Sequence, residues 1–274
     1  MPVINIDGQP LHYSEQGSGH TILFGHSYLW DHSMWAPQIE ALSQHYRVIV
    51  PDLWGHGASG RLPLTTLTLD DLSRQALALL NYLDAQHCSV IGLSVGGMWA
   101  ARLALAEPTR ISGLVLMDTY LGAEPESAKQ YYFSLLKQIE DEGVINPELL
   151  DVIAPMFFHP EINRNLPLYQ GFRDSLASLS AERLRQSIVP LGRMIFGRND
   201  LLPLLNQLDA EATLVMCGEQ DIPRPPYETE EMASLIGCPY ALVPRAGHIS
   251  NLENPQFVTD KLLDFLASKI QKSN

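Results

Sequence analysis

Residues 89–106 read Ser-Val-Ile-Gly-Leu-Ser-Val-Gly-Gly-Met-Trp-Ala-Ala-Arg-Leu-Ala-Leu-Ala, and Ser94 stands near the middle of this stretch. The apolar run at 89–92 predicts a buried strand, and the run from 95 to 106 predicts a helix. Between them, the pattern Gly-x-Ser-x-Gly predicts a sharp turn, because its small residues let the strand and the helix pass close together. We therefore expect Ser94 to be a nucleophile held above a sheet at the N-terminus of a helix.

Strands and helices alternate on both sides of this turn. Further short apolar strands are predicted at 21–24, 47–50, 113–117, 213–217 and 240–243. Near-continuous apolar strands that alternate with helices predict an α/β fold, with a mostly parallel sheet and helices on both of its faces. Residues 122–205 interrupt the alternation and are mostly helical in pattern. We expect a single domain over 1–274, with a helical cap at about 122–205 inserted at the carboxyl edge of the sheet.

A serine nucleophile requires a base, and one histidine has a suitable position for this role. His248 follows the last predicted strand and precedes the last predicted helix, so its loop opens at the same sheet edge as Ser94. Three carboxylates could orient its imidazole: Asp221 and Glu219 follow the penultimate strand, and Asp118 ends an earlier one. The chain order serine, acid, histidine favours Asp221, while Asp118 and Glu219 remain alternatives.

These segments resemble the α/β-hydrolase superfamily, and the resemblance extends over nearly the whole chain. Besides the turn at 92–97, Gly-His-Ser-Tyr at 25–28 is similar to the oxyanion segment of that family. The turn Asp-Leu-Trp-Gly-His-Gly-Ala-Ser at 52–59 matches the family pattern D-x-x-G-x-G-x-S. Residues 218–221 match its acid loop, and residues 247–255 match its histidine loop. The chain looks most similar to small capped carboxylesterases and 3-oxoadipate enol-lactonases.

The resemblance implies roles for backbone groups as well as side chains. The N–H groups of Tyr28 and Val95 would form the oxyanion hole. Ser27 stands where the family usually has glycine, and it adds a hydroxyl near the site. His26 and His56 are expected to hold loops in place and to take no direct part in catalysis.

The expected substrate pocket is apolar. We expect Trp30, Met98, Phe157 and Phe158 to contact the substrate, because they lie in the loops that carry the chemistry or in the helical cap. Such a pocket predicts that neutral esters react faster than substrates with a free carboxylate, since burying a carboxylate without a cation is costly. The cations available in the cap for such a carboxylate are Arg164, Arg173, Arg185, Arg193 and Arg198.

Composition excludes several other classes of protein. The 274 residues carry 18 Lys and Arg against 31 Asp and Glu, so a net charge of −13 disfavours nucleic acid and anionic membranes as partners. No run of eighteen apolar residues predicts a membrane span, and no leader-like segment appears. Three cysteines without a pairing pattern favour a reduced, cytoplasmic protein. No metal-ligand spacing or phosphate-binding loop occurs, so we expect no metal and no cofactor.

Together these observations predict a serine hydrolase that cleaves a small carboxylic ester through an acyl-enzyme intermediate. A lactonase or a carbon–carbon bond hydrolase with the same triad is the alternative. A receptor that binds its ligand without turnover is a further alternative, which an intact Ser-His-Asp set disfavours. The expected partner is a small-molecule ester or lactone.

Overall fold

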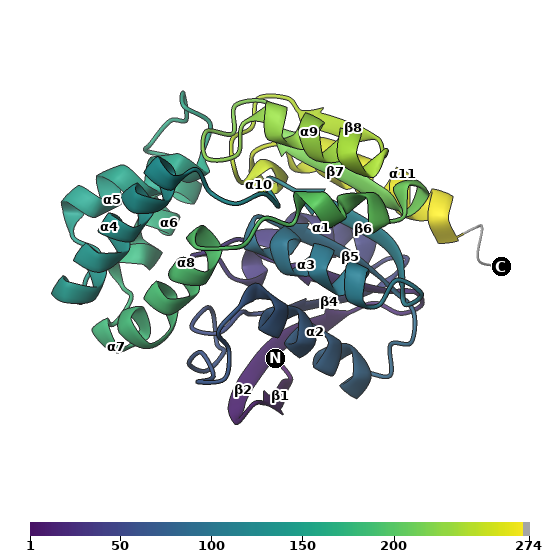
Figure 1. Cartoon of the computed structure of the whole chain (residues 1–274), viewed down its shortest axis with the longest axis horizontal. Helices are drawn as coiled ribbons and strands as arrows, with labels where there is room; N and C mark the ends of the chain where they lie inside the picture. Colours follow the sequence, from purple (N-terminus) through teal and green to yellow (C-terminus); the bar gives the residue numbers. More distant parts are fainter. Residues whose placement is uncertain (271–274) are drawn as a thin grey trace.

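One eight-stranded sheet organises the chain. The computed structural model describes residues 1–270 (Figure 1). The strands are β1 (Val3–Ile6), β2 (Gln9–Gln16), β3 (Thr21–Gly25), β4 (Arg47–Pro51), β5 (Cys88–Leu93), β6 (Ile111–Met117), β7 (Thr213–Gly218) and β8 (Tyr240–Val243). Their order across the sheet is β1-β2-β4-β3-β5-β6-β7-β8.

Most of the sheet is parallel, as the sequence predicts. Strand β2 pairs antiparallel with both β1 and β4, and all other neighbours from β4 to β8 pair in parallel. The central strand β5 is buried along all six residues, as expected for a parallel strand covered on both faces. The carboxyl ends of the parallel strands therefore meet at one edge, and Ser94 directly follows β5 at that edge.

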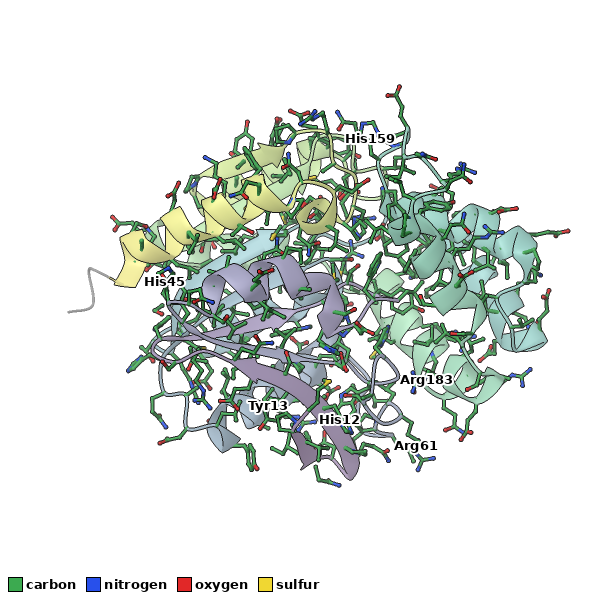
Figure 2. All side chains as sticks on the ribbon, turned by 180° about the vertical axis from the view of Figure 1, so that it is seen from behind. His12, Tyr13, His45, Arg61, His159 and Arg183 are labelled. Carbon is green, nitrogen blue, oxygen red and sulfur yellow. The ribbon has the colours of Figure 1, made fainter. Side chains whose placement is uncertain are left out.

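Helices cover both faces of the sheet, which confirms the predicted α/β class. On one face, α2 (Leu69–Tyr82) packs on α3 (Val95–Ala106), and α9 (Pro226–Ile236) lies against β7. On the other face, α1 (Ala36–Leu42) packs against α11 (Pro255–Ile270), as the view from behind shows (Figure 2). The short elements on the sheet side are η1 (His32–Trp35), η4 (Leu202–Gln207), η5 (Ala210–Ala212) and α10 (Ser250–Glu253).

A second group of helices lies beside the sheet, between β6 and β7 in sequence (Figure 1). Its elements are α4 (Glu126–Glu142), α5 (Pro147–Ile153), η2 (Ala154–Phe157), α6 (Pro167–Ala177), α7 (Ala181–Arg183), η3 (Leu184–Ile188) and α8 (Val189–Phe196). We call residues 126–196 the helical segment. The structure describes all of this segment and places no strand in it.

Hydrogen bonds join the helical segment to the rest of the chain at both ends of the junction between them. His159 donates its N–H to Glu253 Oε1 at 2.8 Å, and the Ile249 N–H donates to the Phe157 carbonyl at 3.1 Å. At the other end, Arg183 Nη1 donates to the Gly57 carbonyl at 3.1 Å. His159 and Arg183 lie at opposite ends of this junction (Figure 2).

No helix within residues 1–270 is both long enough and apolar enough to cross a membrane.

Candidate active site

The turn between β5 and α3 holds Ser94 in a strained backbone conformation. Its φ and ψ are 57° and −119°, a region that serine rarely adopts. Three hydrogen bonds fix this conformation: the Ser94 N–H donates to the Met117 carbonyl, and the Ser94 carbonyl accepts from Met98 N–H and Thr119 Oγ1. Strain maintained by its surroundings is common at functional sites.

Glycines make this turn possible through close backbone contacts. A Cβ atom at Gly96 would collide with the carbonyl of Gly25, at the end of β3. A Cβ atom at Gly92 would collide with the backbone of Gly96 in the first turn of α3. The start of α3 therefore packs directly on the ends of two strands, as the sequence pattern predicts.

Three buried side chains form a continuous hydrogen-bonded chain at this edge. His248 Nε2 lies 3.0 Å from Ser94 Oγ, and His248 Nδ1 lies 2.9 Å from Asp221 Oδ2. Ser94, Asp221 and His248 are exposed by only 8%, 3% and 5%, respectively. Because Asp221 can only accept when ionised, this geometry favours a proton on Nδ1 and leaves Nε2 free to accept from the serine hydroxyl.

The other two candidate carboxylates have different partners. Asp118 accepts from the Gly218 N–H at 2.8 Å and from Ser250 Oγ at 2.6 Å. Burial, together with the neighbouring Asp221 charge, raises the pKa of Asp118 well above its usual range. Glu219 is exposed, and its carboxylate accepts from the Arg245 N–H at 3.4 Å. Of the three candidate carboxylates, all of them in the described chain, Asp221 is the one that contacts the imidazole of His248.

The loop after β3 lines the same cavity as Ser94 through Tyr28 and Leu29. Within the described chain, the N–H groups of Tyr28 and Val95 take part in no turn or cap hydrogen bond. Ser27 is fully buried, and its N–H points at Met34 Sδ at 3.3 Å. Its hydroxyl has no hydrogen-bond partner among residues 1–270. The Tyr28 hydroxyl donates to the Ile188 carbonyl at 2.7 Å and so ties this loop to the helical segment.

Two buried histidines support this loop through their rings. His26 Nε2 accepts from the Leu53 N–H at 2.8 Å, and His56 Nε2 accepts from the Leu29 N–H at 3.0 Å. Each ring therefore carries its proton on Nδ1, which donates to a backbone carbonyl. Burial lowers the pKa of His56 to about 3, so this ring stays neutral at physiological pH. Both contacts agree with the loop-holding roles expected from the sequence.

Ser94 and His248 open into a mostly apolar cavity between the sheet edge and the helical segment. The cavity and the solvent space at its open mouth together amount to about 820 Å³. Of the expected substrate contacts, Met98 and Phe157 line it, and Tyr28 lines it too. The remaining apolar lining is Leu29, Leu135, Leu136, Ile139, Ile145, Ile153, Met156, Ile188, Ile195, Phe196 and Pro223.

Trp30 and Phe158 lie outside this lining, in contrast to the expectation from sequence. Trp30 stacks on Phe172 with ring centroids 4.3 Å apart and faces a second hollow. Phe158 is fully buried between Trp30, Tyr169 and Phe172. Both rings pack against the aromatic side chains of α6 and so help to hold the helical segment in place. They therefore do not line the cavity of Ser94.

The arginines expected to meet a substrate carboxylate also lie elsewhere. Arg173 pairs with Asp151, Arg193 pairs with Glu140, and Arg185 donates to helix carbonyls. The guanidinium of Arg164 lies 6.0 Å from the centre of the Tyr169 ring, and Arg198 pairs with Glu124 behind the cavity wall. None of these five arginines lines the cavity of Ser94 in the described chain.

An arginine outside the helical segment does line the cavity, and the sequence interpretation missed it. Arg224 lies three residues after Asp221, and its guanidinium pairs with Glu124 at 2.8 Å. Loops at the carboxyl ends of parallel strands are where such folds bind ligands. The position of Arg224 in the acid loop therefore indicates a pocket residue, and this signal is present in the sequence.

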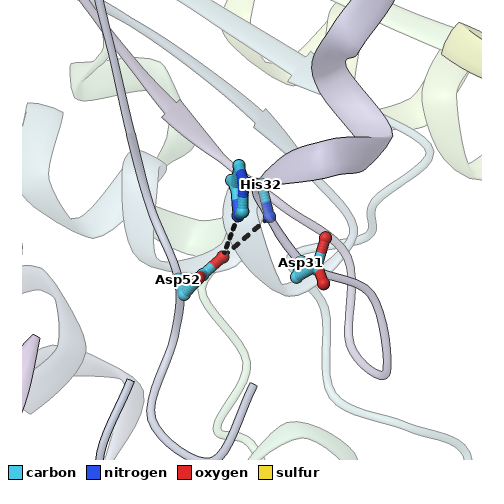
Figure 3. Close-up of side chains that lie close together, drawn as sticks. All are labelled: Asp31, His32 and Asp52. Carbon is cyan, nitrogen blue, oxygen red and sulfur yellow. Dashed lines mark hydrogen bonds and ion pairs between the residues drawn. The ribbon is translucent and has the colours of Figure 1, made fainter. Parts of the chain in front are cut away.

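Two groups of side chains bring possible metal-ligating atoms together. Asp31, His32 and Asp52 form one group, shown in Figure 3. Asp52 Oδ1 accepts from the His32 N–H and lies 2.8 Å from His32 Nδ1, while Oδ2 accepts from the Ala58 N–H. The hydrogen bond to Asp52 raises the pKa of His32. This group holds two loops together and does not line the cavity. The second group is Asp118, Cys217 and Asp221, all of them buried.

Comparison with known proteins identifies the family. The family model of the alpha/beta hydrolase fold matches residues 20–255. The chain is 27% identical over 239 residues to 3-oxoadipate enol-lactonase 1 of Acinetobacter baylyi, covering 86% of this chain and 84% of that protein. A thermophilic esterase from Thermogutta terrifontis superposes with a TM-score of 0.84 at 29% identity, covering 95% and 94% of the two chains. An enol-lactonase from Burkholderia xenovorans superposes with a TM-score of 0.84 at 28% identity, covering 97% and 100%. The chain belongs to the alpha/beta hydrolase family.

Proposed function

We propose that the protein is a serine hydrolase that cleaves a small carboxylic ester through an acyl-enzyme intermediate. The observation that carries this proposal is the hydrogen-bonded chain from Ser94 Oγ through His248 to Asp221, which opens into an apolar cavity. A serine in a strained turn, a base within hydrogen-bond distance and an acid behind the base are the parts that acyl transfer requires. The free thiols of Cys88, Cys217 and Cys238 support a reducing compartment such as the cytoplasm.

The first half of the reaction forms the acyl-enzyme. Ser94 Oγ bonds to the substrate carbonyl carbon while its proton passes to His248 Nε2. Asp221 holds the imidazole in the required tautomer and stabilises the imidazolium ion that forms. His248 then gives this proton to the alcohol oxygen as the ester bond breaks, and the alcohol departs.

The second half of the reaction returns the enzyme to its starting state. A water molecule bonds to the acyl carbon while His248 Nε2 takes its proton. The proton then returns to Ser94 Oγ as the acyl–serine bond breaks, which releases a carboxylic acid.

The negative charge on the carbonyl oxygen would be met by backbone donors. The N–H groups of Tyr28 and Val95 are available for it, and the Val95 N–H lies in the first turn of α3, where the helix dipole favours negative charge. Such preorganised donors contribute on the order of 3 kcal/mol each to acyl transfer. His26 and His56 hold the loop that carries the Tyr28 N–H.

A lactone is the second candidate substrate, because relatives of this chain are named as enol-lactonases. The same steps apply, except that the alcohol stays attached to the acyl group and both ends leave together when water attacks. A carbon–carbon bond hydrolase with the same triad is a further alternative. Kinetics on a panel of matched esters and lactones would separate these substrates, and we expect the activity to survive EDTA.

The test of the proposed function is the variant Ser94→Ala. It removes the nucleophile and leaves only binding and oxyanion effects, so kcat for a short phenyl ester should fall by on the order of 10³-fold or more. Labelling by a fluorophosphonate should disappear with the activity. Retained turnover with labelling at another serine would reject the assignment, and labelling without turnover in the wild type would favour the receptor alternative.

A further inference from the structure

Arg224 is a buried cation in the wall of the cavity that holds Ser94. Its side chain is 8% exposed, and it lines both this cavity and a hollow at the surface that is separate from the one beside Trp30. The two hollows share Glu124, Tyr132, Met156, Pro223 and Arg224, so Arg224 stands where the catalytic cavity meets the surface. We propose that the Arg224 guanidinium binds a carboxylate of the substrate, and that the enzyme therefore acts on esters or lactones of dicarboxylic acids. This inference rests on the proposed function.

The hydrogen bonds of Arg224 satisfy Nη2 and leave the buried Nη1 without an acceptor in the described chain. Nη2 pairs with both carboxylate oxygens of Glu124, at 2.8 and 2.9 Å, and Nε lies 3.6 Å from Glu228 Oε2. Nη1 has no hydrogen-bond partner among residues 1–270. A buried N–H group without a partner costs free energy, and an arginine is well suited to bind a carboxylate. A substrate carboxylate would supply the missing acceptor.

The backbone of Arg224 is also tied to the proposed catalytic acid, Asp221. The Arg224 N–H donates to Asp221 Oδ1 at 3.0 Å, and its carbonyl accepts from Cys217 Sγ at 3.2 Å. On the far side, Arg198 Nη1 holds Glu124 at 2.7 Å. Binding a carboxylate at a side chain ordered in this way loses little conformational entropy.

The charges around Arg224 favour an anion. Arg198 and Arg224 face Glu124 and Glu228, and burial raises the pKa of Glu228 to about 7. Partial protonation of Glu228 near physiological pH reduces the negative charge beside the two guanidinium groups. Tyr132 also lines the cavity beside Arg224, and its hydroxyl is a second possible donor to the same carboxylate.

The rest of the cavity determines the other parts of the substrate. Between Arg224 and Ser94 the wall is made of apolar side chains such as Met98, Ile153 and Phe157. A substrate that fits has a carboxylate at one end, a short hydrocarbon chain in the middle and the reactive carbonyl at the other end. The sequence led us to expect a preference for neutral esters, and this inference reverses it. The arginines expected in the cap do not line the cavity, but Arg224 of the acid loop does.

The experiment compares matched substrates that differ only in the terminal charge. Phenyl monoesters of dicarboxylic acids from glutarate to suberate are paired with phenyl alkanoates of equal acyl length, and kcat/KM is corrected for spontaneous hydrolysis. At the best length, the wild type should prefer the anionic ester by at least about tenfold. Arg224→Gln should lower this ratio by at least about tenfold, and Arg224→Lys should keep part of it because the charge remains.

Arg193→Gln is the matched control, because it removes one positive charge from an arginine that lies outside the cavity lining. It should leave the ratio of the two kcat/KM values within about twofold of the wild type. Fluorophosphonate labelling of Ser94 in each variant reports whether the catalytic centre is still reactive. A wild type without preference at every chain length, or an Arg224→Gln variant with an unchanged ratio, would overturn the proposal.

A measurement on the wild type covers the case in which Arg224→Gln does not fold. Adipate should inhibit hydrolysis of a neutral ester at least about tenfold more strongly than adipamide, its neutral analogue. Equal inhibition would reject the carboxylate site. If Ser94-dependent hydrolysis of neutral esters is present without any effect of charge, the proposed function stands and only the Arg224 inference fails. If Ser94→Ala keeps full activity, the proposed function itself fails.

Discussion

At the scale of single residues, two buried aspartates at the same sheet edge have different partners. Asp221 contacts His248 Nδ1, whereas Asp118 joins the Gly218 N–H to the Ser250 hydroxyl. Asp118 therefore connects the acid loop to the histidine loop without touching the imidazole. Burial and the charge of Asp221 raise the pKa of Asp118. An uncharged side chain at position 118 therefore resembles the protonated form of Asp118.

This division of roles predicts different effects of the same substitution at the two positions. Asp221→Asn should lower kcat by on the order of 10⁴-fold, because an amide favours the wrong tautomer of His248. Asp118→Asn should lower kcat by no more than about tenfold, because the amide oxygen can still accept from the Gly218 N–H. Steady-state kinetics on one neutral ester measures both effects. The reverse order of the two losses would place the catalytic acid at Asp118.

At the scale of elements, the start of α3 depends on close contact with two strands. Gly96 lies against the Gly25 carbonyl, whereas Gly171, on the exposed face of α6, has nothing within 4 Å of a Cβ position. Both glycines are helical, so alanine raises the intrinsic helix propensity equally at the two positions. The difference between the two substitutions therefore measures the close packing at the turn.

We expect Gly96→Ala to lower the free energy of unfolding by about 1–3 kcal/mol, because the methyl group must push β3 and α3 apart. Gly171→Ala should raise the free energy of unfolding by about 0.5–1 kcal/mol. Urea titrations followed by far-ultraviolet circular dichroism measure both values. Gains of equal size at both positions would show that the turn has room for a Cβ atom.

At the scale of the whole molecule, one buried charge cluster connects distant parts of the chain. Glu124 follows β6, Arg198 follows the helical segment, Arg224 lies in the acid loop and Glu228 lies in the first turn of α9. Glu228 titrates near 4.5 when unfolded and near 7 in the fold, because burial disfavours its charge. Between these two values the folded state holds more protons, so this group lowers stability as the pH rises from about 4.5 to 7.

The variant Glu228→Gln should remove this loss. Near pH 4.5 the wild type and the variant should have similar free energies of unfolding. Above pH 7 the variant should be more stable by at most about 3 kcal/mol. Thermal unfolding of both proteins at several pH values from weakly acidic to weakly alkaline measures the difference. A difference that is constant with pH would show that Glu228 is ionised throughout.

Much of the fold and of the site can be predicted from the sequence, because the decisive signals are local. The strand, turn and helix around Ser94 lie within eighteen consecutive residues. His248 and Asp221 each follow a predicted strand, and a parallel sheet brings the carboxyl ends of its strands to one edge. The sheet topology therefore predicts that these side chains lie close together. The order serine, acid, histidine along the chain favours Asp221 over the other candidate acids.

The pocket depends on contacts that no local pattern contains. Trp30 turns away from the cavity because the aromatic side chains of α6 offer a stacking partner, and Phe158 is buried in the same cluster. Arg224 pairs with Glu124, which lies 100 positions earlier in the sequence. This pairing fixes the Arg224 guanidinium in the cavity wall. Side-chain directions of this kind depend on how the helical segment packs against the sheet edge. The sequence thus determined the fold and the candidate catalytic groups. Only the tertiary structure decided which charged side chain lines the cavity, because that depends on which buried ions pair with each other.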